Sequence, residues 1–321
     1  MRALVLGELS GPDGLAVEDI PAPVGDGARI EVHAAGVSFA DLLMTRGEYQ
    51  VRPEVPFVPG LEVAGVLRSV PTGSDLRPGD RVAAFVFGGG FAEEVVADPA
   101  HVVPIPAGLD FAEAAGFVVN YHTAWFALVR RAGLQPGERV LVQGAGGGLG
   151  TATVGVAKAL GASVIGVASS PAKAALAEAA GASVVVDAGP DWAARVRETA
   201  AGGVDVAVDP VGGERFDDTL RCLAPGGRLV VVGFAGGGIP QIKVNRLLLR
   251  NVGVLGAAWR EFLATDPGLT AEATGALNAM VDDGRLRPLV GARYPLEDGA
   301  DALRALAERR AAGKLVLTVR T

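Results

Sequence analysis

The sequence predicts an α/β chain in which a β-rich first part is followed by a parallel sheet covered by helices on both faces. Two observations support this fold class. From about residue 120, short apolar strands alternate with Ala-rich helical stretches, which is typical of a parallel sheet buried on both sides. Before residue 120, short runs rich in β-branched residues are separated by Gly and Pro, which indicates short strands and turns.

The first part contains four predicted strands, and five prolines between residues 53 and 78 argue against a long parallel sheet there. After about residue 260 come two helical runs and a final strand at 314–319. This tail is too short to fold alone, so we expect it to pack on the first part. The four predicted strands are 28–37, 61–70, 80–86 and 91–98.

Bulk composition limits the classes of function. The chain has 321 residues, of which 50% are hydrophobic and 20% charged, so we expect roughly two domains with sizeable cores. A net charge of −7 argues against a nucleic-acid partner. No apolar run reaches the roughly 18 residues of a membrane span, and the N-terminus lacks a signal-peptide pattern. With Cys222 as the single cysteine, no intrachain disulfide can form, and we expect a cytoplasmic protein with no membrane partner.

Residues 142–152 read VQGAGGGLGTA, between a predicted strand at 139–144 and a predicted helix at 151–160. Free amides and the helix dipole favour an anion at such a turn. The glycine spacing matches the dinucleotide fingerprint with Ala in the first position, so Gly147 would admit a pyrophosphate and Gly150 would permit close helix–strand packing. A plain structural turn is the alternative. The predicted Rossmann-type cofactor loop comprises Ala145, Gly147, Gly148, Leu149 and Gly150.

The end of the next strand, 163–169, indicates which dinucleotide binds. An NAD site usually places an acid there against the ribose 2′-hydroxyl, but no acid follows this strand. Ser169 and Ser170 can donate hydrogen bonds to a 2′-phosphate, and Lys173 can supply positive charge. These residues favour NADPH as the cofactor. Alternatively, the serines only cap a helix and Lys173 is solvated, and both interpretations can hold together.

With these residues in place, the chain resembles the zinc-independent quinone oxidoreductase branch of the medium-chain dehydrogenase/reductase superfamily over nearly its whole length. The resemblance implies a GroES-like catalytic domain at 1–121 and 263–321, and a Rossmann domain at 122–262. It also implies a nicotinamide cleft between domains and a homodimer formed through nucleotide-domain sheet edges. The segments that carry the resemblance are 34–49, 56–67, 76–85, 120–125, 134–150, 208–213, 223–234 and 313–319.

Two positions bear on zinc. Zinc-dependent relatives carry Cys and His where this chain has Ser38 and Leu61. A structural zinc site would need about four thiolates, and the three histidines of the chain have no metal-ligand spacing. We therefore expect no metal site.

The resemblance also indicates candidate site residues. Tyr49 and Ser38 are candidate catalytic hydrogen-bond donors, and Tyr49 can also deliver a proton. A loop anchor and a small packing residue are the alternatives for these two side chains. Where relatives often carry a Tyr against the adenosine, this chain has Asp187 and Ala188. Four further residues are expected to line the cofactor site: Asn120, Thr123, Val211 and Phe234.

A site without metal can still reduce a carbon that is already polarised by conjugation. The expected function is an NADPH-dependent reductase that transfers hydride to quinones or α,β-unsaturated carbonyls. An enoyl-thioester reductase is one alternative. A catalytically silent NADPH-binding protein is the other.

Overall fold

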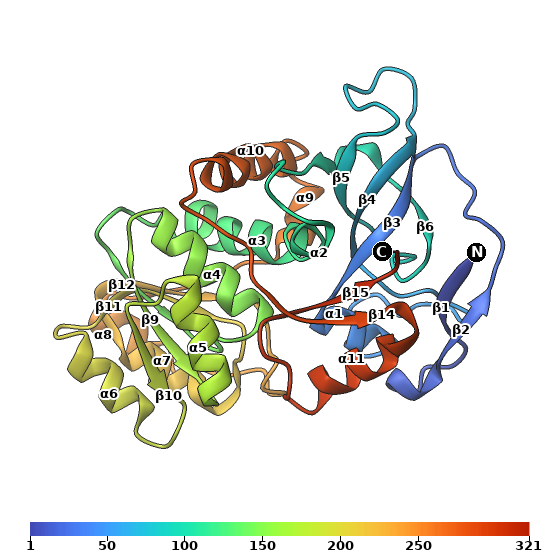
Figure 1. Ribbon diagram of the computed structural model, residues 1–321. Helices are drawn as coiled ribbons and strands as arrows, with labels where there is room; N and C mark the ends of the chain where they lie inside the picture. The colour runs from blue at the N-terminus through green and yellow to red at the C-terminus, as the bar shows by residue number, and fades with distance from the viewer. Residues whose placement is uncertain (321) are drawn as a thin grey trace. The chain divides into compact units, whose positions relative to one another are not determined.

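The computed structural model describes residues 1–320. It contains two large β-sheets and one two-stranded ribbon (Figure 1). The chain divides into two units. The first comprises Met1–Val119, Thr270–Asn278 and Val290–Thr321, and the second comprises Asn120–Leu269 and Ala279–Leu289.

The first unit is built on a seven-stranded sheet with the order β14-β15-β3-β4-β5-β7, in which β6 pairs with β3. Neighbouring strands are antiparallel except β14 and β15, which are parallel. The ribbon of β1 and β2 is antiparallel. The strand bounds are Arg2–Leu6 (β1), Leu15–Asp19 (β2), Ala28–Val37 (β3), Glu62–Ser69 (β4), Arg81–Phe85 (β5), Glu94–Ala97 (β6), Val102–Pro104 (β7), Val290–Pro295 (β14) and Lys314–Thr318 (β15).

The C-terminal tail completes this sheet, because β15 pairs with β3 through Leu315↔Val37 and the following residues. The alternation of buried and half-buried residues along β3 gives the sheet one core face. Its core gathers aliphatic side chains from β3, β4, β5, β15 and α11. The helices wholly within this unit are Phe39–Thr45 (α1), Phe111–Ala115 (α2) and Gly299–Ala307 (α11), with 3-10 turns at Gly11–Gly14 (η1), Pro99–His101 (η2) and Leu296–Asp298 (η5).

The second unit contains the parallel sheet that the strand–helix alternation predicts, in the order β10-β9-β8-β11-β12-β13. All five neighbouring pairs are parallel. Its strands are almost wholly apolar because both faces are covered. The bounds are Arg139–Val142 (β8), Ser163–Ala168 (β9), Val184–Asp187 (β10), Val204–Asp209 (β11), Leu223–Val231 (β12) and Gly253–Gly256 (β13).

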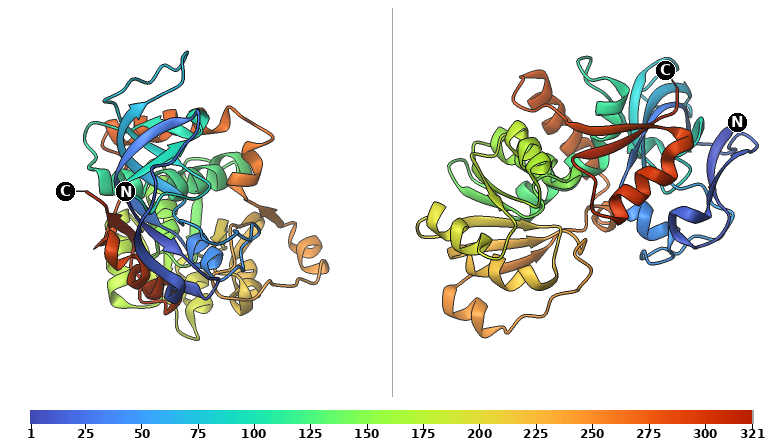
Figure 2. Two further views of the ribbon diagram at one scale, coloured as in Figure 1. Left: turned by 90° about the vertical axis from the view of Figure 1, so that its right-hand side faces the viewer. Right: turned by 60° about the horizontal axis from the view of Figure 1, so that its bottom comes forward.

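Helices α4 and α5 pack on β8, β9 and β10, whereas α6 and α7 pack on each other and on β10, β11 and β12. The two pairs lie on opposite sides of the sheet (Figure 2). Right-handed crossovers require this, because the chain winds outward from β8 to β10 and then from β11 to β13. The remaining bounds are Val118–Trp125 (α3), Phe126–Arg131 (a π-helix, η3), Gly148–Ala159 (α4), Pro171–Ala180 (α5), Trp192–Thr199 (α6), Gly213–Arg215 (η4), Phe216–Arg221 (α7), Asn245–Arg250 (α8), Trp259–Leu263 (α9) and Leu269–Asp282 (α10).

One predicted helix differs in extent. The helix expected at 151–160 begins at Gly148, so the last glycines of the loop form its first turn. Helix α7 ends at Arg221, and Leu223 already belongs to β12 because it pairs with Val204. No helix within residues 1–320 is long and apolar enough to cross a membrane.

Candidate functional site

The loop between β8 and α4 contains glycines that the fold requires and one that it does not. A Cβ on Gly150 would lie 2.0 Å from the carbonyl oxygen of Gly144, and a Cβ on Gly146 would lie 2.4 Å from the Cβ of Lys173. At Gly147, a Cβ would meet only the Gly144 carbonyl oxygen, at 3.4 Å, an ordinary van der Waals distance. Packing within the protein therefore explains Gly146 and Gly150 but leaves open space beside Gly147.

The first turn of α4 presents backbone donors at the same place. Gly147 is the N-cap residue, with φ −90° and ψ 175°, and it has no side chain to bond the helix amides. The amides of Gly148, Leu149 and Gly150 lie in the first turn, where an α-helix has no acceptor of its own. Together with the partial positive charge of the helix N-terminus, these donors suit a phosphate group.

The end of β9 lies against this loop. The Ala145 amide donates to the Val167 carbonyl oxygen at 2.9 Å. Ser170 is the N-cap of α5, and its Oγ accepts from the Lys173 amide at 3.3 Å. The Lys173 ammonium donates to the Ser169 Oγ at 3.4 Å. The capping role of Ser170 is therefore present, and it leaves Ser169 and the Lys173 ammonium side by side next to the glycine loop.

The ends of β11 and β12 join the same edge of the sheet. Asp209 is fully buried, and its Oδ1 accepts from the Val211 and Gly212 amides at 2.8 and 2.9 Å. Burial raises the pKa of this carboxyl. A Cβ on Gly144 would lie 3.2 Å from a Val211 methyl, and a Cβ on Gly212 would lie 2.9 Å from the Phe234 ring. Val211 thus lies next to Gly144 of the glycine loop, and the Phe234 ring lies next to Gly212.

Strand order in this sheet reverses between β8 and β11. In open α/β sheets, ligands bind outside the carboxyl ends of the strands at such a reversal. The glycine loop from β8 and Val211 from β11 flank this point. This edge of the sheet is therefore the candidate dinucleotide site, with the start of α4 as the expected pyrophosphate position and the end of β9 as the expected adenosine end.

Two more candidate residues lie on α3. Asn120 is buried and Thr123 is half-buried, and a spacing of three residues places them on one side of the helix. His122 is fully buried, with its ring centroid 5.6 Å from that of Trp259. The imidazole therefore packs in the interior of the second unit.

In the first unit, Ser38 is the N-cap of α1 and forms a capping box with Asp41. The Ser38 hydroxyl and amide donate to Asp41 Oδ2 at 2.6 and 2.8 Å, and the Gly60 amide donates to Oδ1 at 3.1 Å. Burial raises the pKa of Asp41 to about 6, and the Ser38 hydrogen bonds act in the opposite direction. Tyr49 lies half-buried in a bend after α1.

A buried ion pair joins Glu62 on β4 to Lys314 on β15, and both side chains are almost wholly inaccessible. The second Glu62 oxygen accepts from the Val119 amide at 2.8 Å. The Lys314 charge also lowers the pKa of Asp41. Lys314 was not among the predicted site residues. The signal available in the sequence was the lone charge that opens the apolar run at 314–319, because a buried charge needs a partner.

The two positions that hold zinc ligands in zinc-dependent relatives carry other side chains here. Ser38 bonds Asp41, and Leu61 is buried in the first unit. Across residues 1–320, no three His, Cys, Asp or Glu side chains come close enough together to hold a metal ion.

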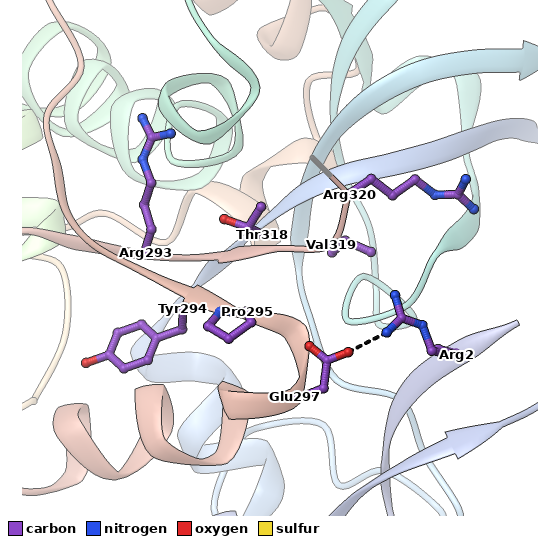
Figure 3. Close-up of a pocket in the computed structure, with 8 residues that line it drawn as sticks. All are labelled: Arg2, Arg293, Tyr294, Pro295, Glu297, Thr318, Val319 and Arg320. Atoms are coloured by element: carbon purple, nitrogen blue, oxygen red, sulfur yellow. Dashed lines mark hydrogen bonds and ion pairs between the residues drawn. The ribbon is translucent and has the colours of Figure 1, made fainter.

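A separate hollow of about 730 Å³ in the first unit contains none of the predicted site residues (Figure 3). Its three arginines already have carboxylate partners: Arg2 bonds Glu297, Arg293 bonds Asp110, and Arg320 lies 3.4 Å from Glu31. The hollow is therefore close to charge-balanced. Its lining residues are Arg2, Arg293, Tyr294, Pro295, Glu297, Thr318, Val319 and Arg320.

Comparison with known proteins gives matches over nearly the whole chain. Residues 25–107 match the family model of the alcohol dehydrogenase GroES-like domain, and residues 148–274 match that of zinc-binding dehydrogenases. The chain is 38% identical to quinone oxidoreductase-like protein 2 of Bos taurus, over 99% of this chain and 93% of the relative.

Two solved structures are also similar. A probable oxidoreductase from Mycobacterium abscessus is 47% identical, with 99% of both chains covered and a TM-score of 0.91. The quinone oxidoreductase of Thermus thermophilus, which has also been solved in complex with NADPH, is 40% identical. There, 99% of this chain and 100% of the other are covered, with a TM-score of 0.85.

Proposed function

Because the chain belongs to the quinone oxidoreductase branch of the medium-chain dehydrogenase/reductase superfamily, we propose that it binds NADPH and reduces quinones or α,β-unsaturated carbonyls. The observation that carries the proposal is the space beside Gly147, which the fold itself leaves open at the strand reversal. The NADPH complex of the Thermus thermophilus relative supports the choice of cofactor.

The residues of the second unit fit this cofactor. The first-turn amides of α4 bind the pyrophosphate, and Gly147 lets it approach the backbone. Ser169 and Lys173 bind the 2′-phosphate, because no acid at the end of β9 repels it. Val211 and Phe234 line the site toward β11 and β12.

NADPH, when bound, supplies the hydride. The chain must then hold the acceptor and provide a hydrogen bond to the oxygen on which negative charge develops. We assign this donor role to Tyr49. The Ser38 hydrogen is already committed to the Asp41 carboxylate, which can only accept. Ser38 therefore contributes its remaining acceptor capacity and its small size, while Asp41 keeps its side chain in place.

The test is to measure NADPH and NADH binding by calorimetry and to follow NADPH absorbance with menadione, cyclohexenone or crotonyl-CoA as the acceptor. We expect NADPH to bind more tightly and to be oxidised only when menadione or cyclohexenone is present. A clear preference for NADH, or failure to bind either dinucleotide, would falsify the proposal.

The same assays separate the two alternatives. Turnover with crotonyl-CoA alone would identify an enoyl-thioester reductase. Thermal stabilisation by NADPH without turnover on any acceptor would identify a catalytically silent binding protein. The variant Tyr49→Phe tests the donor role, because it keeps the ring and removes only the hydroxyl.

We also propose that the chain forms a homodimer through the second unit. Strand β13 ends the six-stranded sheet, and within residues 1–320 it pairs only with β12. Large apolar side chains near it are strongly exposed, which monomeric surfaces seldom show as a group. Light scattering should give a dimer, and Leu248→Arg should give a folded monomer. We further propose a cytoplasmic location, as the single cysteine leads us to expect. The exposed side chains are Ile239, Val244, Leu248 and Leu249.

A further inference from the structure

The Arg215 guanidinium lies just past the carboxyl end of β10, against Ala188 and Trp192. Its Nη2 donates to the Ala188 carbonyl oxygen at 2.5 Å. The Ala188 amide itself donates to the Ala168 carbonyl oxygen at 2.9 Å. In a parallel ladder, the next bond would come from the Ser170 amide to the Ala188 carbonyl oxygen. Arg215 occupies that acceptor instead, so its guanidinium lies just past the end of β10, the strand next to the one that Ser169 follows.

This arginine reaches across the sheet edge from the segment that follows β11. It belongs to η4, while Ala188 follows β10 at the far end of the sheet. The guanidinium also lies over the Trp192 ring, at 5.8 Å from its centroid. Two contacts on the β10 side thus hold a side chain that originates beside β11, and they fix its position at the predicted adenosine end of the site.

The charges around Arg215 leave it able to bind an anion. A guanidinium has five N–H donors, and within residues 1–320 the structure gives this one a single hydrogen bond, to Ala188. Asp209 interacts with it electrostatically, but that side chain is fully buried and bonds two backbone amides. Asp187, at the end of β10, is exposed and accepts from the Gly189 amide at 2.9 Å.

We propose that Arg215 binds the 2′-phosphate of NADPH together with Ser169 and Lys173. This inference rests on the proposed function. A phosphate monoester carries a charge of about −1.5 to −2 near neutral pH, so one lysine alone does not balance it. Asp187 adds negative charge at the same edge. The planar guanidinium can bond two phosphate oxygens at once, which an ammonium group cannot do in that geometry.

The experiment uses the full chain and two fragments of the cofactor, 2′-phospho-AMP and AMP, with binding measured by calorimetry. These fragments isolate the adenosine half from turnover. We expect Arg215→Met to weaken the binding of 2′-phospho-AMP by about tenfold or more, which is the effect of losing a hydrogen bond to a charged group. AMP binding should stay within about twofold of wild type, and Arg215→Lys should be intermediate. Arg221→Met, on the same helical segment and paired with Asp218, is the matched control and should leave both fragments unaffected.

Equal weakening of both fragments by Arg215→Met would show that Arg215 supports the adenine or the fold, and would overturn the inference. Unchanged binding of both fragments would overturn it as well. In either case, wild-type binding of NADPH would leave the proposed function intact. Failure of the wild-type chain to bind NADPH would remove both. Thermal unfolding of each variant without ligand shows whether the substitution has disturbed the fold.

Discussion

Alanine substitutions at Gly147 and Gly150 should have opposite consequences, although the two residues lie three positions apart in one loop. Gly147→Ala should leave the fold intact and impair cofactor binding. Gly150→Ala should destabilise the fold directly. The difference follows from what each new Cβ would contact: one ordinary neighbour at 3.4 Å for Gly147, and a backbone oxygen at 2.0 Å for Gly150.

The expected stabilities follow from these contacts. At Gly147 the backbone angle of −90° suits alanine. A weaker N-cap costs about 0.5–1 kcal/mol, and lower entropy of the unfolded chain returns about 0.4–1 kcal/mol. At Gly150, helix propensity gains about 1 kcal/mol, but overlap with a backbone oxygen that cannot rotate away costs about 3 kcal/mol. The net loss of about 2 kcal/mol should lower Tm by about 4–8 °C.

Cofactor binding should be impaired directly by Gly147→Ala, the substitution that leaves the fold intact. A methyl group on Gly147 occupies the space beside the first-turn amides of α4, so at least one bond to the pyrophosphate is lost. Such a bond contributes about 1.5–3 kcal/mol, so its loss should weaken NADPH binding by about 10- to 100-fold. Thermal unfolding and calorimetry with NADPH measure the two effects separately. Wild-type affinity in Gly147→Ala, or wild-type stability in Gly150→Ala, would refute the reasoning.

Four further predictions concern single side chains. Lys173→Met should reduce the preference for NADPH over NADH by about tenfold, measured as a ratio of Kd values. Tyr49→Phe should lower kcat by about a hundredfold with little change in the Kd of NADPH. Burial raises the pKa of Asp41 from 3.8 to about 6, so the folded chain holds this proton more tightly, and stability is lost as pH rises through 6. The unfolding free energy of wild type in urea should therefore fall by about 2 kcal/mol relative to that of Asp41→Asn between pH 4 and pH 7, and a difference independent of pH would contradict this. Burial raises the pKa of the Cys222 thiol to about 11, so a thiol reagent at pH 8 should label it only after unfolding.

Local sequence was enough to predict much of the candidate nucleotide site, because its residues lie close together in the chain. The glycine loop follows a strand directly, and Ser169, Ser170 and Lys173 lie within one turn of each other. The start of α4 was less predictable, since the glycines of its first turn have poor helix propensity. These glycines become helical because Gly147 serves as the N-cap and because Gly150 can pack closely against Gly144.

Residues that act through distant partners were not predicted. Strand β14 was not expected as a strand at all, and it forms by pairing with β15. Lys314 finds Glu62 at a separation of 252 residues, and Arg215 reaches Ala188 across the ends of intervening strands. Neither contact has a signal in the spacing of neighbouring residues.

The sequence by itself determined the fold class, the strand–glycine–helix loop, the absence of an acid after the second strand of the parallel sheet, and the family. These features depend on periodicity, backbone freedom and the order of motifs, which are properties of the chain before it folds. Only the tertiary structure decided which glycine faces open space, which carboxyl has its pKa raised to about 6 by burial, and which arginine lies past the end of β10. Those properties depend on burial and on charges brought together from different strands, so they exist only once the chain has folded.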